Sequence, residues 1–147
     1  MRRYHYGFRA SSPVHGDAPQ RRHSNPASRR RGTHSSIVVC GAYEGKAAFV
    51  SVYPRSQKIR NLRRNPNCTV LCVTDDWREW VSVEGQATLY DYGNLDAEEA
   101  RVMLRKVYMA CSDTEHPDWE EYDQAMIDQE AVIVLVEPKR IYGLLRS

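Results

Sequence analysis

The sequence predicts a small, mainly β domain: an antiparallel β-barrel with two or three helices packed at its side. Two observations support this fold class. Short β-rich apolar runs follow one another through brief polar turns, and amphipathic helical segments come mainly after the fourth of these runs. Few parallel βαβ units can be drawn from this order, which favours antiparallel pairing. With 147 residues, the chain suits one domain, which we expect to span residues 33–147.

The first predicted element is a β-hairpin. Residues 37–43 and 47–53 are rich in β-branched and aromatic side chains, and Glu44-Gly45-Lys46 joins them as a short loop with Gly at the turn. A short helix follows, in which Ser56 is a candidate N-cap and Ile59 and Leu62 point inward. It ends near Arg64, because Asn65-Pro66-Asn67 stops a helix.

Two further strands are predicted at residues 68–74 and 79–89, joined by a tight polar link at Asp75-Asp76. The Glu84-Gly85 pair within the second strand indicates a bend, because Gly in a strand often marks a kink or a close backbone approach.

Two amphipathic helices and a last strand complete the pattern. A capping box of Asp96 and Glu99 opens the first helix. The second helix opens at His116-Pro117-Asp118 and runs to about Asp128. The last strand covers residues 131–136 and resumes near 140–144, with Pro138 at a bulge or an edge. The apolar positions of the first helix recur at helical spacing: Ala100, Met103, Leu104, Val107 and Cys111.

The first 32 residues differ from the rest in composition. They are rich in Arg, Ser, Pro and His, with few large apolar side chains, so we predict that they are disordered or an anomalous start of the chain. They hold eight of the 21 basic residues and one of the 19 acidic ones, which leaves 13 basic against 18 acidic residues in the rest. The domain is therefore acidic, which argues against a nucleic-acid partner.

The four cysteines show no C-x-x-C spacing and no clustered His ligands, so we expect reduced thiols, no metal site and a cytoplasmic protein. The longest apolar runs are strand-sized and far below the roughly 20 residues of a membrane-spanning helix, so no membrane span is expected.

The sharpest candidate site begins where the second strand ends. Backbone N–H groups at a helix start, the Ser56 hydroxyl and the Lys58 ammonium suit a phosphate, with Arg55 or Arg60 adding charge. An ordinary capped helix with a solvated basic face fits the same spacing. The spacing alone leaves both interpretations open.

A wider pattern surrounds this site, in residues 55–66, 68–73, 80–89, 116–126 and 141–143. It resembles the pyridoxamine 5'-phosphate oxidase-like split-barrel superfamily, and more closely the branch that binds the deazaflavin coenzyme F(420). The resemblance covers residues 32–143. It implies a split barrel that forms a homodimer, with a cofactor at each of two clefts between subunits.

The resemblance also assigns cofactor-binding positions. Ser56, Gln57 and Lys58 stand at the phosphate, and Trp77 and Trp80 border the ring or its tail. The remaining positions are the backbone of Ser36, Ile37 and Val38 beside the ring, and Val52, Tyr53, Pro54, Arg55 and Asn61 along the cofactor.

The implied function is that of an F(420)H2-dependent reductase, which transfers a hydride to a small electron-poor acceptor. An FMN-binding oxidoreductase and a non-catalytic F(420)- or flavin-binding protein are the alternatives. Trp80 stands where FMN oxidases of the superfamily often carry Gln, and the basic C-terminal substrate motif of a pyridoxamine phosphate oxidase is not found. No catalytic residue is assigned; Tyr43 and Tyr53 are possible proton donors, though each is more simply a barrel tyrosine. The first strand of the superfamily has no clear counterpart, which suggests a divergent or mistranslated start.

Overall fold

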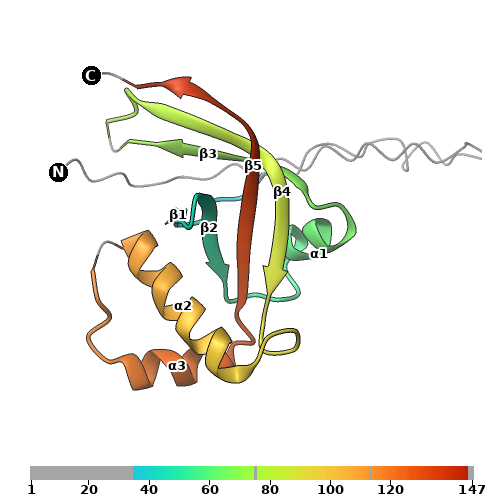
Figure 1. The fold of residues 1–147 in the computed structure, drawn as a ribbon, viewed down its shortest axis with the longest axis vertical. Coiled ribbons are helices and arrows are strands. Elements are labelled where there is room, and N and C mark those ends of the chain that lie inside the picture. The colour runs from blue at the N-terminus through green and yellow to red at the C-terminus, as the bar shows by residue number, and fades with distance from the viewer. Residues whose placement is uncertain (1–34, 75, 113, 146–147) are drawn as a thin grey trace, which may run out of the picture.

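The computed structural model describes residues 35–74, 76–112 and 114–145, so the predicted disorder of residues 1–32 lies outside the described residues. Five antiparallel strands and three helices make up this part of the chain, which confirms the mainly β class (Figure 1). In chain order the elements are β1 (Cys40–Tyr43), β2 (Lys46–Ser51), α1 (Gln57–Arg64), β3 (Asn67–Val73), β4 (Trp80–Tyr90), α2 (Ala97–Ser112), α3 (Trp119–Asp128) and β5 (Val132–Leu144).

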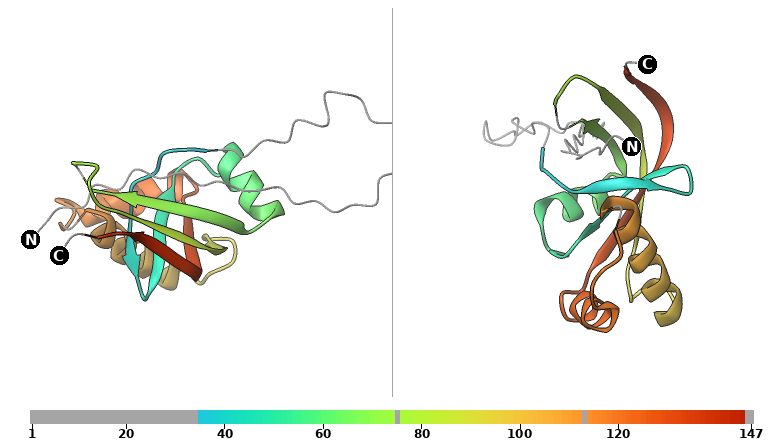
Figure 2. Two further views of the ribbon diagram at one scale, coloured as in Figure 1. Left: turned by 90° about the horizontal axis from the view of Figure 1, so that it is seen from above. Right: turned by 90° about the vertical axis from the view of Figure 1, so that its left-hand side faces the viewer.

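The strands form one sheet in the order β1-β2-β5-β4-β3, in which every neighbouring pair is antiparallel. The last strand in sequence is therefore the central one. All five strands, or the residues leading into them, contribute side chains to a single apolar cluster, so the sheet must curl around it. This is the barrel-like arrangement that the sequence predicts, and β1 and β3 are its edges (Figure 2).

The central strand β5 explains the longest apolar run of the sequence. Val132, Val134 and Val136 face the barrel interior, whereas Ile133 and Leu135 face a second cluster beneath α2 and α3. Both faces of this half of β5 are buried, which produces a continuous apolar run instead of an alternating one.

The helices pack against two different apolar clusters. Ile59 and Leu62 of α1 enter the barrel cluster, while Leu104 of α2 and Tyr122 of α3 belong to the second cluster. Helix α2 packs closely on β1, because a Cβ on Gly41 would overlap the backbone of Ala110. Figure 1 shows α1 on one side of the sheet and the α2–α3 pair on the other, with the end of β2 between them.

Several predicted boundaries and details change. Residues 37–39 precede β1 instead of belonging to it, and the first turn is the two-residue Glu44-Gly45, both at positive φ, because Tyr43 already pairs with Lys46. Ser56 is the N-cap of α1 by position, but its side chain makes no capping hydrogen bond, so the predicted cap is wrong in that respect.

The predicted break in the last strand is a bulge within one long strand. Gly85 pairs with Pro138 and Glu84 with Arg140, which leaves Lys139 without an opposite residue. A Cβ on Gly85 would overlap the carbonyl oxygen of Glu137, so the predicted bend at Glu84-Gly85 depends on glycine.

Candidate functional site

Two buried hydroxyl groups without partners mark the region around the start of α1. Among the described residues, the Oγ atoms of Ser36 and Ser56 are buried side-chain atoms that make no hydrogen bond. Ser36 lies before β1 and Ser56 after β2, and the chain leading into β1 passes beside α1 (Figure 2). A buried hydroxyl without a partner costs about 1 to 3 kcal/mol, so such groups are usually satisfied by water or a ligand.

Backbone N–H groups without a partner inside the helix also lie at the start of α1. The Ser56 N–H donates to the Tyr53 carbonyl at 3.0 Å, and this turn positions Ser56 directly before α1. The first N–H group with a partner inside the helix is that of Arg60, which donates to the Ser56 carbonyl at 3.0 Å. The N–H groups of residues 57–59 precede it and are the orphan donors of a helix start, which attract anions.

Lys58 adds a positive charge to this helix start. Its side chain is half-buried, and it makes no ion pair with any residue that the structure describes. Desolvation lowers the pKa of its ammonium group below the ordinary value. A half-buried ammonium without a counter-charge is unfavourable in the free protein and suits an anionic ligand.

Gln57 and Asn61 have partners within the helix. The Gln57 amide donates to Asn61 Oδ1 at 2.7 Å, and the Arg64 guanidinium donates to the same oxygen at 3.1 Å. Asn61 is buried, so its oxygen serves the helix, and any contact with a ligand depends on the rest of its amide group.

A cavity of about 660 Å³ opens where β2 faces α3. Val39, Val50 and Val52 line its sheet side, and Tyr108, His116 and Tyr122 line its helix side. Its volume and apolar lining are those of a site for a ring-shaped molecule. Of the predicted residues, Val52 lies in this cavity, next to Ser51, whose hydroxyl accepts a hydrogen bond from the Tyr53 N–H at 3.4 Å.

His116 is a candidate site residue that the sequence does not single out, because it precedes α3 and resembles an ordinary residue at the start of a helix. The Asp118 N–H donates to its Nδ1 atom at 3.0 Å, so a neutral His116 carries its proton on Nε2. Its ring packs against Tyr108, Tyr122 and Trp119, with centroids 5.3 to 5.9 Å apart. Trp119 and Tyr122 are three positions apart, which fits one packing face of a helix, but nothing in the sequence links Tyr122 to β2.

The other predicted residues near the strand end lie further out. Tyr53 is 69% exposed, and Pro54 and Arg55 line a separate cavity of about 340 Å³ beside Asp91 and Tyr92. Ile37 is exposed, and Val38 is buried in the barrel cluster.

Trp77 and Trp80 are not brought to this region within one chain. They lie in and after the β3–β4 turn, and α1 precedes the opposite end of β3, about 20 Å away along a seven-residue strand. Trp77 is 75% exposed at a φ of 59°, which is unusual for a bulky side chain. The Trp80 ring packs edge-to-face on the Tyr142 ring, with the ring centroids 6.0 Å apart.

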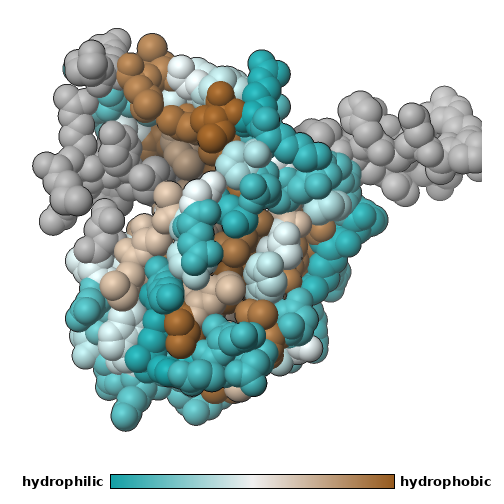
Figure 3. Space-filling model, in the orientation of Figure 1, coloured by the Kyte–Doolittle hydropathy of each residue, from teal (hydrophilic) through white to brown (hydrophobic). Residues whose placement is uncertain are grey.

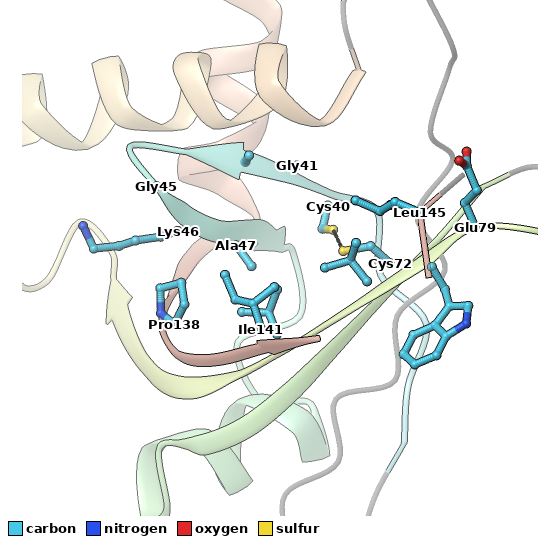
Figure 4. A pocket seen from close by; sticks show the side chains of 14 residues that line it. Cys40, Gly41, Gly45, Lys46, Ala47, Cys72, Glu79, Pro138, Ile141 and Leu145 are labelled. Atoms are coloured by element: carbon cyan, nitrogen blue, oxygen red, sulfur yellow. Dashed lines mark hydrogen bonds between the residues drawn. The ribbon is translucent and has the colours of Figure 1, made fainter. Parts of the chain in front are cut away.

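A third cavity, of about 390 Å³, lies inside the barrel between the edge strands. Its walls include Cys40, Cys72, Val81 and Ile141 (Figure 4). Figure 3 shows apolar surface at the end of the sheet where this cavity emerges, and Ile141, Leu144 and Leu145 are the exposed apolar residues of the chain there.

The described residues contain no group of three or more His, Cys, Asp or Glu side chains that could hold a metal ion. Within the same part of the chain, no helix has the length and apolar character to cross a membrane.

Comparison with known proteins defines the class. The family profile of pyridoxamine 5'-phosphate oxidase matches residues 27–145, which include every predicted cofactor position. The chain belongs to the pyridoxamine 5'-phosphate oxidase family, whose members are oxidoreductases.

Solved structures share this fold at low sequence identity. A conserved hypothetical protein of Mycobacterium tuberculosis has a TM-score of 0.62 and 18% identity over 95% of this chain and 76% of that chain. An F(420) reductase has a TM-score of 0.55 and 19% identity over 97% and 92% of the two chains. A pyridoxamine 5'-phosphate oxidase-related, FMN-binding protein of Nostoc punctiforme has a TM-score of 0.58 and 12% identity over 95% and 74%.

The residues present fit a phosphate-bearing flavin-type cofactor. The Ser56 hydroxyl lacks a partner, the half-buried Lys58 ammonium has no described counter-charge, and the apolar cavity that contains Val52 begins four residues before Ser56. Ser36, Ser56 and Lys58 are not among the residues that line this cavity, so the segment from Val52 to Ser56 is what links the two parts of the site.

Proposed function

We propose that this protein is an F(420)H2-dependent reductase that transfers a hydride to a small electron-poor acceptor. The observation that carries the proposal is the buried, unpartnered Ser56 hydroxyl at the start of a helix that also bears the half-buried Lys58. A phosphate there would accept hydrogen bonds from both side chains and from the helix start.

Two observations favour F(420) over FMN as the cofactor. The F(420) reductase neighbour shares the fold over nearly the full length of both chains, and Trp80 replaces the Gln that FMN oxidases of the superfamily often carry. The second candidate, an FMN-dependent oxidoreductase, is favoured by the family match and by the FMN-binding neighbour.

Each part of the site has a separate task. Ser56, Gln57 and Lys58 would hold the phosphate, and the turn from Tyr53 to Arg55 would lead from it to the ring. Val52, which lines the apolar cavity, and the backbone of Ser36, Ile37 and Val38 would form the surface beside the ring. When bound, the reduced deazaflavin supplies the hydride, so the protein contributes position and orientation.

The proposal includes a homodimer. In one chain, Trp77 and Trp80 lie about 20 Å along β3 from the α1 residues. An exposed Trp77 in a left-handed backbone conformation is doubly unfavourable in a monomer, which fits a residue that covers a cofactor held by the partner subunit.

Titration of the purified protein with F(420) and, separately, with FMN tests the cofactor, with fluorescence quenching as the measurement. We expect tight binding of F(420) and binding of FMN that is at least 100-fold weaker. Tight FMN binding without F(420) binding would overturn the proposal in favour of the second candidate. If F(420) binds tightly but its reduced form is not oxidised by any quinone, nitro compound or tetrapyrrole tested, the protein is a carrier and not a reductase.

A further inference from the structure

Two cysteine sulfur atoms face each other inside the barrel. Cys40 of β1 and Cys72 of β3 have their Sγ atoms 3.8 Å apart, close enough for a thiol hydrogen bond (Figure 4). These residues are 32 positions apart in sequence and belong to the two edge strands of the sheet, which do not pair with each other.

Small solutes can reach the pair. Both cysteines line the 390 Å³ barrel cavity, and so do Ile141 and Leu145, which are 61% and 64% exposed. The cavity therefore extends from the sulfur atoms to the surface. Since one water molecule takes up about 30 Å³ in the liquid, a peroxide of similar size fits easily.

The two thiols differ in reactivity. Burial raises the pKa of Cys40, which is almost fully enclosed and remains a protonated thiol. The hydrogen bond with Cys40 lowers the pKa of Cys72, which is partly exposed. Cys72 is thus the better nucleophile of the pair, and Cys40 lies in position to react with it second.

We propose that Cys40 and Cys72 form an oxidative modification site, at which a peroxide converts the two thiols into an intramolecular disulfide that joins the edges of the sheet. The Cys72 thiolate attacks a peroxide oxygen, the O–O bond breaks, and the departing hydroxide takes a proton to become water. Cys40 sulfur then attacks the Cys72 sulfenic acid, the S–O bond breaks, and a second water leaves with the Cys40 proton. Two electrons pass from the thiols to the peroxide.

The geometry permits the final bond. A disulfide requires the sulfur atoms to approach to about 2.0 Å, and no ladder of hydrogen bonds fixes β1 relative to β3. Among the described residues, no hydrogen bond joins the sulfur of Cys68 or Cys111 to another cysteine: Cys68 is buried in the barrel cluster, and Cys111 Sγ donates to the Ala48 carbonyl at 3.6 Å, on the α2 side of the sheet.

Treatment of the full-length protein with hydrogen peroxide, followed by thiol counting and non-reducing tryptic mass spectrometry, tests the site. We expect loss of two of the four thiols, a mass lower by about 2 Da, and a link between the peptides 32–46 and 65–78. Dithiothreitol should reverse the change. Tandem fragmentation of the linked peptides should place the bridge on Cys72 in the wild-type protein, so the result does not depend on a variant that folds.

Two variants make a matched pair. Cys72→Ala should abolish the link, whereas Cys68→Ala, which removes a thiol from the same peptide and the same face of β3, should retain it. The proposal is overturned if the link passes through Cys68, or if peroxide drives Cys72 to the sulfinic acid while Cys40 stays reduced. Because no cofactor is needed, this outcome is independent of F(420) or FMN binding.

Discussion

The buried hydroxyl of Ser56 carries a cost in the free protein that a bound phosphate would remove. Its position before α1 follows from the sequence, because the β-rich run at residues 47–53 is followed shortly afterwards by a helix with inward Ile59 and Leu62. Its orientation does not follow, because the same residue type is found in caps and in ligand sites. The side chain leaves the helix N–H groups unbonded and is enclosed by neighbouring chain segments.

We predict opposite effects of Ser56→Ala on stability and on binding. Without cofactor, the variant should unfold at higher urea concentration, with a gain of roughly 1 kcal/mol, because a buried unsatisfied hydroxyl is removed and no capping bond is lost. Cofactor affinity should fall. Ser51→Ala is the matched control: it removes a buried hydroxyl that bonds to the Tyr53 backbone, and it should destabilise. A Ser56→Ala protein that is less stable without cofactor would show that the hydroxyl has a structural partner.

At the scale of elements, local sequence patterns predicted the strands and helices well, but they did not predict which distant strands pair. The turn at Glu44-Gly45 and the bulge at Pro138 have sequence signatures, because glycine and proline restrict the backbone locally. The pairing of β2 with β5 has none, because it joins residues more than 80 positions apart through apolar side chains that would pack on many partners. For the same reason, the sequence does not predict the contact between Cys40 and Cys72, although two strand residues four positions apart, such as Cys68 and Cys72, share a face of the sheet.

An ion pair whose strength varies with pH joins α2 and α3 beside their apolar contact. Arg105 Nε donates to Asp123 Oδ1 at 2.9 Å, and its second nitrogen donates to the other carboxylate oxygen. This hydrogen bonding lowers the pKa of Asp123 below its ordinary value of 3.8. A lowered folded-state pKa means that the carboxylate stabilises the fold above the unfolded-state value, and that this contribution disappears as the pH falls through the folded-state value.

Asp123→Asn should therefore be less stable than the wild type at pH 7, and the two proteins should become similar in stability as the pH falls well below 3.8. Urea unfolding at a series of pH values from 7 down to 2.5 measures the difference. Asp128→Asn is the control on the same helix, because its carboxylate accepts an exposed hydrogen bond from Gln124 and makes no ion pair with any described residue. A constant difference between Asp123→Asn and wild type across this range would contradict the ionic origin of the contact.

At the scale of the whole molecule, the predicted cofactor residues fall into two groups that one chain keeps apart. Lys58 lies with α1, and Trp77 lies beyond the far end of β3, which has seven residues. The sequence assigned both groups to one cofactor through resemblance, and a single subunit does not bring them together. An arrangement in which each site takes Lys58 from one subunit and Trp77 from the other satisfies both facts, and mixed dimers can test it.

Lys58→Ala should weaken cofactor binding roughly 10- to 150-fold, which corresponds to about 1.5 to 3 kcal/mol for a charged hydrogen bond. Trp77→Ala should weaken it separately. When the two variants are unfolded together and refolded at equal amounts, half of the dimers should be mixed, and each mixed dimer has one intact and one doubly altered site. Roughly one quarter of all sites should then regain wild-type affinity in a stoichiometric titration.

Lys106→Ala is the control variant: it removes the same charge from an exposed position on α2, and it should bind the cofactor normally alone and in mixtures. If mixing restores no tight sites, both residues act within one subunit, and light scattering that shows a monomer would exclude the shared site altogether.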